Sequence, residues 1–271
     1  MELCYNINFL IIKIVKFEWV EAGHFLHKMK KIILNPSEIT KKGVLAGSII
    51  IILWTLSLLF WLNWKIDYFN PWMYLGILIQ THLYTGLFIT THDSIHGVVA
   101  PSYPKLNRWI GIITATLFAF NNYWILEKKH HQHHDYVNTD KDPDVHQGNF
   151  FIWWFKFIFQ YVSWKQVLLM AITYNILKIW FPMWNLILFW ELPAILGTIQ
   201  LFYFGTYIPH KGNHHPENIY QSRSQKLNHF GSFISCYFFG YHYEHHAFPY
   251  LPWWKLPKAK EDLVKNSQNY Y

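Results

Sequence analysis

The sequence predicts an all-α integral membrane protein, with four transmembrane helices in two hairpins and a cytoplasmic helical cap rich in histidine. The first observation is composition, since 52% of the 271 residues are hydrophobic and only 14% are charged. Soluble domains carry about 25% charged residues. The second is the presence of long uncharged runs, and the third is an aromatic content of 20%, which is typical of a wide membrane–water interface. These numbers argue against a soluble globular domain and exclude a disordered chain.

Four spans are expected along the chain. Residues 43–64 and 68–92 contain no Asp, Glu, Lys or Arg, and each run matches the roughly 20 residues that cross a bilayer core. Residues 166–209 carry two such charges in 44 residues, enough for two spans that break at 182–184. The uncharged run 109–126 is expected to lie in the interface, because a full span there would separate the histidine clusters. A very apolar buried core is the alternative, and runs of this length argue against it.

Basic residues indicate the orientation. With four spans, 21 of the 23 Lys and Arg residues share one side, and Lys65 and Lys178 are the exceptions. The positive-inside rule makes that side cytoplasmic, so both termini and residues 93–165 are expected there, in a bacterial inner membrane. A net charge of +7 would also suit nucleic acid, but the lysines gather beside apolar runs and form no long stripe. No nucleic-acid partner is therefore expected.

The expected organisation has three parts. Residues 1–40 form an amphipathic, basic extension, 41–262 the membrane domain and 263–271 a C-terminal tail. No charged leader region with a small-residue cleavage site marks a signal peptide. The two cysteines, Cys4 and Cys236, make a disulfide scaffold or a thiolate metal site improbable.

Histidine is the residue whose number needs explanation, because the chain has 17 against 16 carboxylates. Three clusters stand out at 92–96 (HDSIH), 130–134 (HHQHH) and 242–246 (HYEHH). Positions i, i+3 and i+4 share one face of a helix, so the histidines at these spacings point together, and one more follows the fourth span. The expected metal ligands are His92, His96, His130, His133, His134, His210, His242, His245 and His246.

The number of ligands says more about the metal than their type does. Imidazole binds Zn, Cu, Fe and Ni, so histidine alone does not name the metal. One tetrahedral zinc takes four ligands, whereas nine suit two six-coordinate metals with positions left for oxygen or water. We therefore favour two irons with O₂ as co-substrate. A zinc protease is disfavoured because Glu244 precedes His245 and no H-E-x-x-H occurs, and a haem bundle would need histidines within the spans.

The remaining histidines have simpler interpretations. His131 lies off the shared face of its cluster, and His214 and His215 are less favoured because they lie in a loop containing Gly, Asn and Pro. Polar residues that reach interfacial water are the expectation for His24, His27, His82, His146 and His229.

Ligand histidines usually donate their second N–H to a carboxylate or a carbonyl. The nearby candidates are Asp93, Asp140, Asp142, Asp144 and Glu244. For the three aspartates around Pro143, a solvated turn is the alternative. Beyond the metal ligands, the sequence indicates no separate catalytic residue.

Boxes of the form HxxxH, HxxHH and HxxHH on a four-span chain resemble the membrane fatty-acid desaturase/hydroxylase superfamily. The residues beside the boxes resemble bacterial-type β-carotene ketolases, and the likeness covers roughly residues 40–260. The segments that carry it are 88–99 (FITTHDSIHGVV), 139–144 (TDKDPD), 201–210 (LFYFGTYIPH), 239–246 (FGYHYEHH) and 251–257 (LPWWKLP).

This resemblance implies a di-iron oxygenase that converts C4 of a β-ionone ring to a ketone, taking β-carotene to echinenone and canthaxanthin. Each hydroxylation uses O₂ and two electrons, and two in succession give a gem-diol that loses water. The apolar substrate would enter from the bilayer. Because no GxGxxG fingerprint or other cofactor motif occurs, a separate donor such as ferredoxin is expected to supply the electrons. A fatty-acid desaturase or lipid hydroxylase on the same scaffold is the alternative, and a metal transporter is disfavoured because its ligands would lie at the membrane midplane.

The chain departs from the family pattern in three places. Its first 35 residues lie outside the likeness, and Asp135-Tyr136-Val137-Asn138 replaces a Gly/Pro-containing stretch. Glu191 stands inside the fourth span, where an apolar residue is usual. A carboxylate within a membrane is costly and by default a functional candidate, although a snorkelling or protonated side chain is also compatible with this position.

Overall fold

The computed structural model describes residues 35–146 and 148–268, and every regular element in these residues is helical. Expectations for residues 1–34, including Cys4, His24 and His27, lie outside the described residues. The elements are α2 (Pro36–Leu62), α3 (Pro71–Ile95), α4 (Pro104–Leu117), α5 (Tyr123–Asp135), α6 (Phe150–Tyr161), α7 (Trp164–Leu177), α8 (Met183–Leu186), the π-helical turn η1 (Ile187–Glu191), α9 (Leu192–Phe202), the π-helical turn η2 (Tyr203–Tyr207), α10 (Ile208–His210), α11 (His229–Cys236), α12 (His242–Ala247), the 3₁₀ turn η3 (Trp253–Lys255) and α13 (Leu256–Gln268).

Asparagine side chains cap the start of five of these helices, among them α2, α3 and α5. Asn35 accepts hydrogen bonds from the backbone N–H groups of residues 37 and 38, and a proline follows it at the first helical position of α2. Asn70 and the following proline begin α3 in the same way. Asn122 accepts from the N–H groups of residues 124 and 125 and so begins α5, the helix that carries the second histidine box.

Two helical stretches of the described chain are long and apolar enough to cross a membrane. They are Pro36–Leu62 and Met183–His210, the second running continuously from α8 to α10. Helix α3 has 25 residues, but Gln80 and His82 lower its hydropathy. The chain turns near Pro182 as the sequence predicts, yet α7, the helix before this turn, has only 14 residues. At 1.5 Å per residue α7 covers about 21 Å, which is less than a bilayer core.

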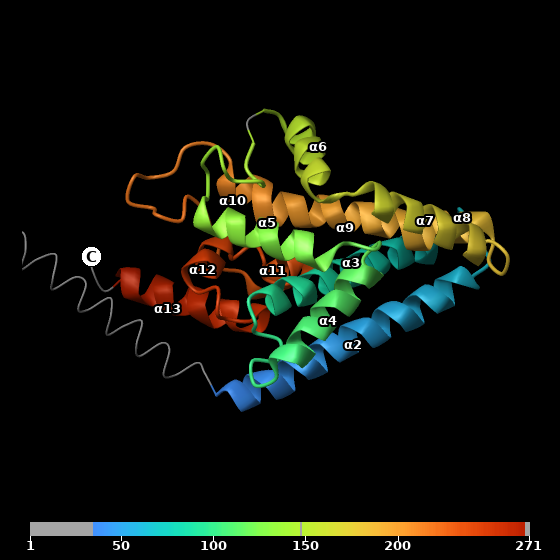
Figure 1. Ribbon diagram of the computed structural model, residues 1–271, viewed down its shortest axis with the longest axis horizontal. Coiled ribbons are helices and arrows are strands. Elements are labelled where there is room, and N and C mark those ends of the chain that lie inside the picture. The colour runs from blue at the N-terminus through green and yellow to red at the C-terminus, as the bar shows by residue number, and fades with distance from the viewer. Residues whose placement is uncertain (1–34, 147, 269–271) are drawn as a thin grey trace, which may run out of the picture.

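Helix α3 lies at the centre of the bundle, packed against α2, α4 and α9 (Figure 1). Its core cluster includes Trp54, Leu87, Phe118, Trp190 and Phe239. The outer face of α2 exposes a row of large apolar side chains, which suits contact with lipid rather than with water. This row contains Leu45, Ile52, Leu56 and Phe60.

The uncharged run 109–126 is not one helix. It is divided between α4 and α5 by a turn in which Ala119 and Phe120 have φ values of 53° and 57°, in the left-handed region. Gln166 of α7 holds this turn by donating from Nε2 to the Ala119 carbonyl oxygen over 2.8 Å. The turn redirects the chain, so that α5 runs toward the same end of the molecule as the end of α3 (Figure 1).

The expected domain boundaries fall within helices. Helix α2 already begins at Pro36, inside the predicted extension, and α13 continues through 263–268, inside the predicted tail.

Candidate metal centre

Four segments bring histidines to one end of the molecule, where α5, α10 and α12 meet the end of α3 (Figure 1). His92 lies in the last turn of α3, and His96 is the residue that caps it, immediately before Gly97 with a φ of 74°. Helices α5 and α12 carry the second and third boxes, and His210 ends α10. The structure thus brings together all nine histidines that the sequence singles out.

Eight of the nine form two groups of four, and within each group the candidate ligand atoms lie within 4.8 Å of one another. The first group is His92, His96, His130 and His245, and the second group is His133, His210, His242 and His246. His134 lies between them, with its Nε2 2.9 Å from that of His245 and its ring centroid 4.3 Å from that of His246. His130 and His133 of box two, about one helical turn apart, therefore belong to different groups.

The separations between Nε2 atoms suit shared metal ions. They are 3.2 Å for His92 and His245, 2.7 Å for His96 and His130, and 3.0 Å for His242 and His246. Two nitrogens bound at right angles to one metal, each about 2.1 Å from it, are about 3.0 Å apart. The residues of each group thus fit a shared metal ion.

His210 has one ring nitrogen engaged and one open. Its Nδ1 lies 2.9 Å from the carbonyl oxygen of Gln221, which can only accept, so Nδ1 donates. Its Nε2 is buried and has no hydrogen-bond partner among the described residues. An orphaned buried acceptor is costly unless it is satisfied, and a metal in the second group would satisfy it.

Two carboxylates orient candidate ligands by accepting hydrogen bonds from the Nδ1 atoms of their rings. Asp142 places both its oxygens 2.9 and 3.0 Å from Nδ1 of His133, and Asp93 lies 3.2 Å from Nδ1 of His92. A carboxylate accepts a hydrogen bond from the Nδ1–H group and so favours the tautomer whose Nε2 lone pair is free for a metal. Asp93 is itself held by the backbone N–H of Trp253 over 2.9 Å.

The other three carboxylate candidates differ in their contacts. Asp144 accepts a hydrogen bond from the Tyr161 hydroxyl and lies 4.0 Å from His133, and burial raises the pKa of its carboxyl to about 6. Glu244 accepts from the Ser224 hydroxyl and pairs with Lys260 over 3.2 Å, so it joins α12 to α13 rather than to a histidine. Asp140 is exposed in the turn, as the solvated-turn alternative expects.

Burial favours neutral imidazoles throughout the cluster. It lowers the pKa of His134 to about 2, and it also lowers the pKa values of His130, His242, His245 and His246. At His133 the Asp142 hydrogen bond and the Asp144 charge outweigh burial and raise the pKa. Neutral imidazole is the form that binds a metal.

The histidines interpreted as non-ligands lie apart from the two groups. His131 is exposed, with its ring 6.2 Å from that of His96. His82 stacks on Tyr237 with both ring nitrogens buried, so the expectation that it reaches interfacial water is wrong, whereas His229 pairs with Glu261 over 3.0 Å. These contacts give each a structural surrounding unrelated to the metal groups. His146, His214 and His215 also fall outside the two groups.

Sequence reasoning missed the backbone partners of the site. The carbonyl oxygen of Gln221 accepts a hydrogen bond from His210, and the N–H of Trp253 donates one to Asp93; both contacts use main-chain atoms. No sequence pattern therefore marks them.

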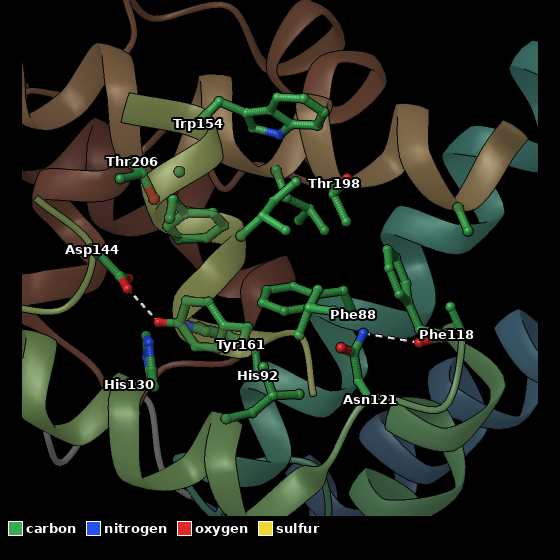
Figure 2. A pocket seen from close by; sticks show the side chains of 18 of the residues that line it. Phe88, His92, Phe118, Asn121, His130, Asp144, Trp154, Tyr161, Thr198 and Thr206 are labelled. Carbon is green, nitrogen blue, oxygen red and sulfur yellow. Dashed lines mark hydrogen bonds between the residues drawn. The ribbon is translucent and has the colours of Figure 1, made fainter. Parts of the chain in front are cut away.

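A cavity of about 440 Å³ opens beside the histidines (Figure 2). His92, His130, His133 and His242 form part of its wall at one end. The remaining wall is mainly apolar and includes Phe88, Leu126, Phe157 and Leu201. This volume lies within the usual range of small-molecule sites, about 300–1,000 Å³. The arrangement can hold an elongated apolar molecule with one end against the metal groups.

Comparison with known proteins gives consistent matches. A family model described as fatty acid desaturase matches residues 69–178 and 150–271. A zeaxanthin 4-ketolase of Chlamydomonas reinhardtii is 40% identical over 190 residues, which cover 66% of this chain and 42% of that protein. A β-carotene ketolase of a Paracoccus species is 38% identical over 184 residues (66% and 76%), and one of Haematococcus lacustris is 37% identical over 193 residues (68% and 60%). The chain thus spans less than half of the Chlamydomonas protein and most of the Paracoccus protein. These matches confirm the resemblance that the histidine boxes and their flanking residues indicate.

Proposed function

The chain belongs to the fatty acid desaturase family, and from this premise we propose that it is a membrane di-iron ketolase acting on C4 of the β-ionone ring of carotenoids. The observation that carries the proposal is the pair of four-histidine groups at the end of a long apolar cavity. Relatives at 36–40% identity that are named β-carotene or zeaxanthin ketolases favour this reaction over desaturation.

Two irons are the proposed metals, one in each group, with His134 between them. When bound, they would supply the activation of O₂ with two external electrons and two protons, so that one oxygen atom enters the C4–H bond and the other leaves as water. A second hydroxylation at C4 gives a gem-diol, which loses water to form the ketone.

The protein residues provide orientation and exclusion of water. Asp142 and Asp93 hold the rings of His133 and His92 in the tautomer whose Nε2 faces the metal. The apolar wall, which includes Phe88, keeps water away from the reacting ring and holds the flat polyene by burial and stacking. The C4–H bond is allylic, so the oxidant needs less power here than at an isolated acyl methylene.

We further propose a four-span topology in which all histidine boxes face the cytoplasm of a bacterial inner membrane. The proposed spans are α2, α3, α7 and the continuous helix from α8 to α10. Uncharged runs, the two apolar helices and the gathering of histidines at one end support it. An external protein such as ferredoxin would deliver electrons at this end, where Lys128, Lys141 and Lys211 are exposed.

Expression in cells that make β-carotene tests the reaction. We expect echinenone and canthaxanthin, with the carbonyl oxygen labelled from ¹⁸O₂ when extraction avoids exchange. Unchanged carotene together with newly unsaturated fatty acids would reverse the choice in favour of a desaturase.

A further inference from the structure

The end of the cavity remote from the histidines carries polar groups that the proposed reaction does not use. In Figure 2, Phe118 and Asn121 lie on the opposite side of the cavity from His130 and Asp144. Gln166, which donates to Asn121, and Glu191 also line the cavity. Polar side chains are expensive within a membrane protein unless something pairs with them.

One face of the continuous helix η1–α9–η2 lines the cavity, so its residues give the length of the cavity. Its lining residues recur at helical spacing between Glu191 and Thr206. Fifteen residues at 1.5 Å each give about 22 Å. The Thr206 end is the metal end, because the neighbouring Gly205 packs against Phe239, whose ring lies 4.9 Å from that of His92. Glu191 therefore lies far from the metal groups, at a distance similar to the length of the polyene chain that joins two ionone rings.

Glu191 is half-buried in the cavity wall and makes no hydrogen bond or ion pair with the described residues. Apolar side chains stand near it in the same wall, among them Ala194 and Ile195 of the next helical turn. A hydrocarbon ring placed there would leave the carboxyl group without a partner. A ring that carries a hydroxyl group would donate to it.

Gln166 provides a second acceptor in this wall. It is 9% exposed, and its Nε2 is committed to two oxygens, 2.8 Å from the carbonyl of Ala119 and 3.1 Å from Oδ1 of Asn121. This pairing fixes the orientation of the amide, since only the nitrogen can donate. Its Oε1 is buried and has no partner among the described residues. A hydroxyl group donates one hydrogen bond, so it would pair with whichever of these two acceptors its ring meets.

Resting on the proposed function, we infer that Glu191 and Gln166 recognise a hydroxyl group on the ring remote from the metal centre. These two residues would then determine specificity: the chain would prefer carotenoids with a 3-hydroxylated ring and would bind that ring away from the histidines. A site built to hydrogen-bond a hydroxyl discriminates strongly against the analogue that lacks it, because its acceptors are then left unpaired.

The test uses β-cryptoxanthin, which has one hydroxylated ring and one unsubstituted ring. Purified full-length protein with iron, O₂ and a ferredoxin reducing system would be given this substrate, and the position of the first ketone would be determined by mass spectrometry. We expect the unsubstituted ring to be oxidised about tenfold more often than the hydroxylated ring. The reason is that the hydroxylated ring gains one hydrogen bond to a charged or buried acceptor when it lies at the remote end. A merely structural role for these residues would not move this ratio.

Variants then assign the preference to its residues. Glu191→Leu should bring the ratio of the two products close to one, whereas Glu191→Gln, which keeps an acceptor, should retain most of the preference. Asn175→Leu, a matched change on the exposed face of α7, should behave as wild type. Product ratios do not depend on how much active protein a sample holds, and if Glu191→Leu yields no folded protein, Glu191→Met, which also removes the acceptors, carries the same test.

The outcomes separate the two proposals. Ketones without a ring preference in the wild type, or a preference that survives in Glu191→Leu and Gln166→Leu, would overturn the inference and leave the ketolase proposal standing. The absence of any ketone from both β-carotene and β-cryptoxanthin would instead overturn the ketolase proposal.

Discussion

Replacing Asp142 with asparagine should weaken metal binding in the second group specifically. Asp142 is 4% exposed, and its two oxygens accept from Nδ1 of His133 and from the backbone N–H groups of Asn138 and Asp144, over 2.8–3.0 Å. An asparagine of the same size keeps one acceptor oxygen and turns an NH₂ group toward donors. At least one N–H is then left facing another donor, and His133 loses the charge that holds its tautomer.

The expected magnitude follows from these contacts. A hydrogen bond to a charged group contributes about 1.5–3 kcal/mol, and loss of a carboxylate behind a metal-bound histidine typically lowers metal affinity about 10–100-fold. That factor corresponds to about 1.4–2.7 kcal/mol. Among the described residues, the histidine that Asp142 hydrogen-bonds is His133 of the second group, so we expect the iron content to fall from two toward one equivalent as chelator is added.

Iron content after dialysis against graded chelator concentrations measures the effect. The matched control is Asp140→Asn, which makes the same chemical change at an exposed position of the same turn and should release iron as the wild type does. Loss of iron at the same chelator concentration in both variants would refute the role assigned to Asp142.

Three further predictions concern ligands, topology and packing. His130→Ala should lose iron and activity while His131→Ala changes neither by more than about twofold, and wild-type protein with a single equivalent of metal would contradict the two-iron proposal. In a background without native cysteines, a membrane-impermeant thiol reagent added to intact cells should label Asp67→Cys and not Gly148→Cys, whereas labelling at position 148 would place the histidines outside. Gly43→Ala would put a Cβ 2.1 Å from the backbone oxygen of Val99, so it should lower the midpoint of thermal unfolding, with a cost of about 1–3 kcal/mol. An unchanged midpoint would show that α2 can shift away from that loop.

Much of the helical framework could be predicted from the sequence because the signals are local. The Asn-Pro pairs before α2 and α3 act on the next two or three residues, and the break at Pro182 needs only the proline itself. The run 109–126 could not be resolved in this way. Its division depends on left-handed residues at Ala119 and Phe120, held by a side chain from α7 that lies 47 positions later.

The histidine boxes show the same boundary between local and long-range information. By itself the sequence determined that His92 and His96, and likewise the members of the other two boxes, can share a helical face, because that spacing is a property of one helix. Only the tertiary structure decided that His130 and His133 of one helix belong to different groups, and that each meets a histidine more than 100 positions away. Only it, too, placed the Trp253 N–H behind Asp93 and Glu191 in the wall of the cavity that begins at the histidines. These relations depend on which helices pack together, and the free energy of that packing comes from apolar surface spread over the whole chain, so no short segment encodes it.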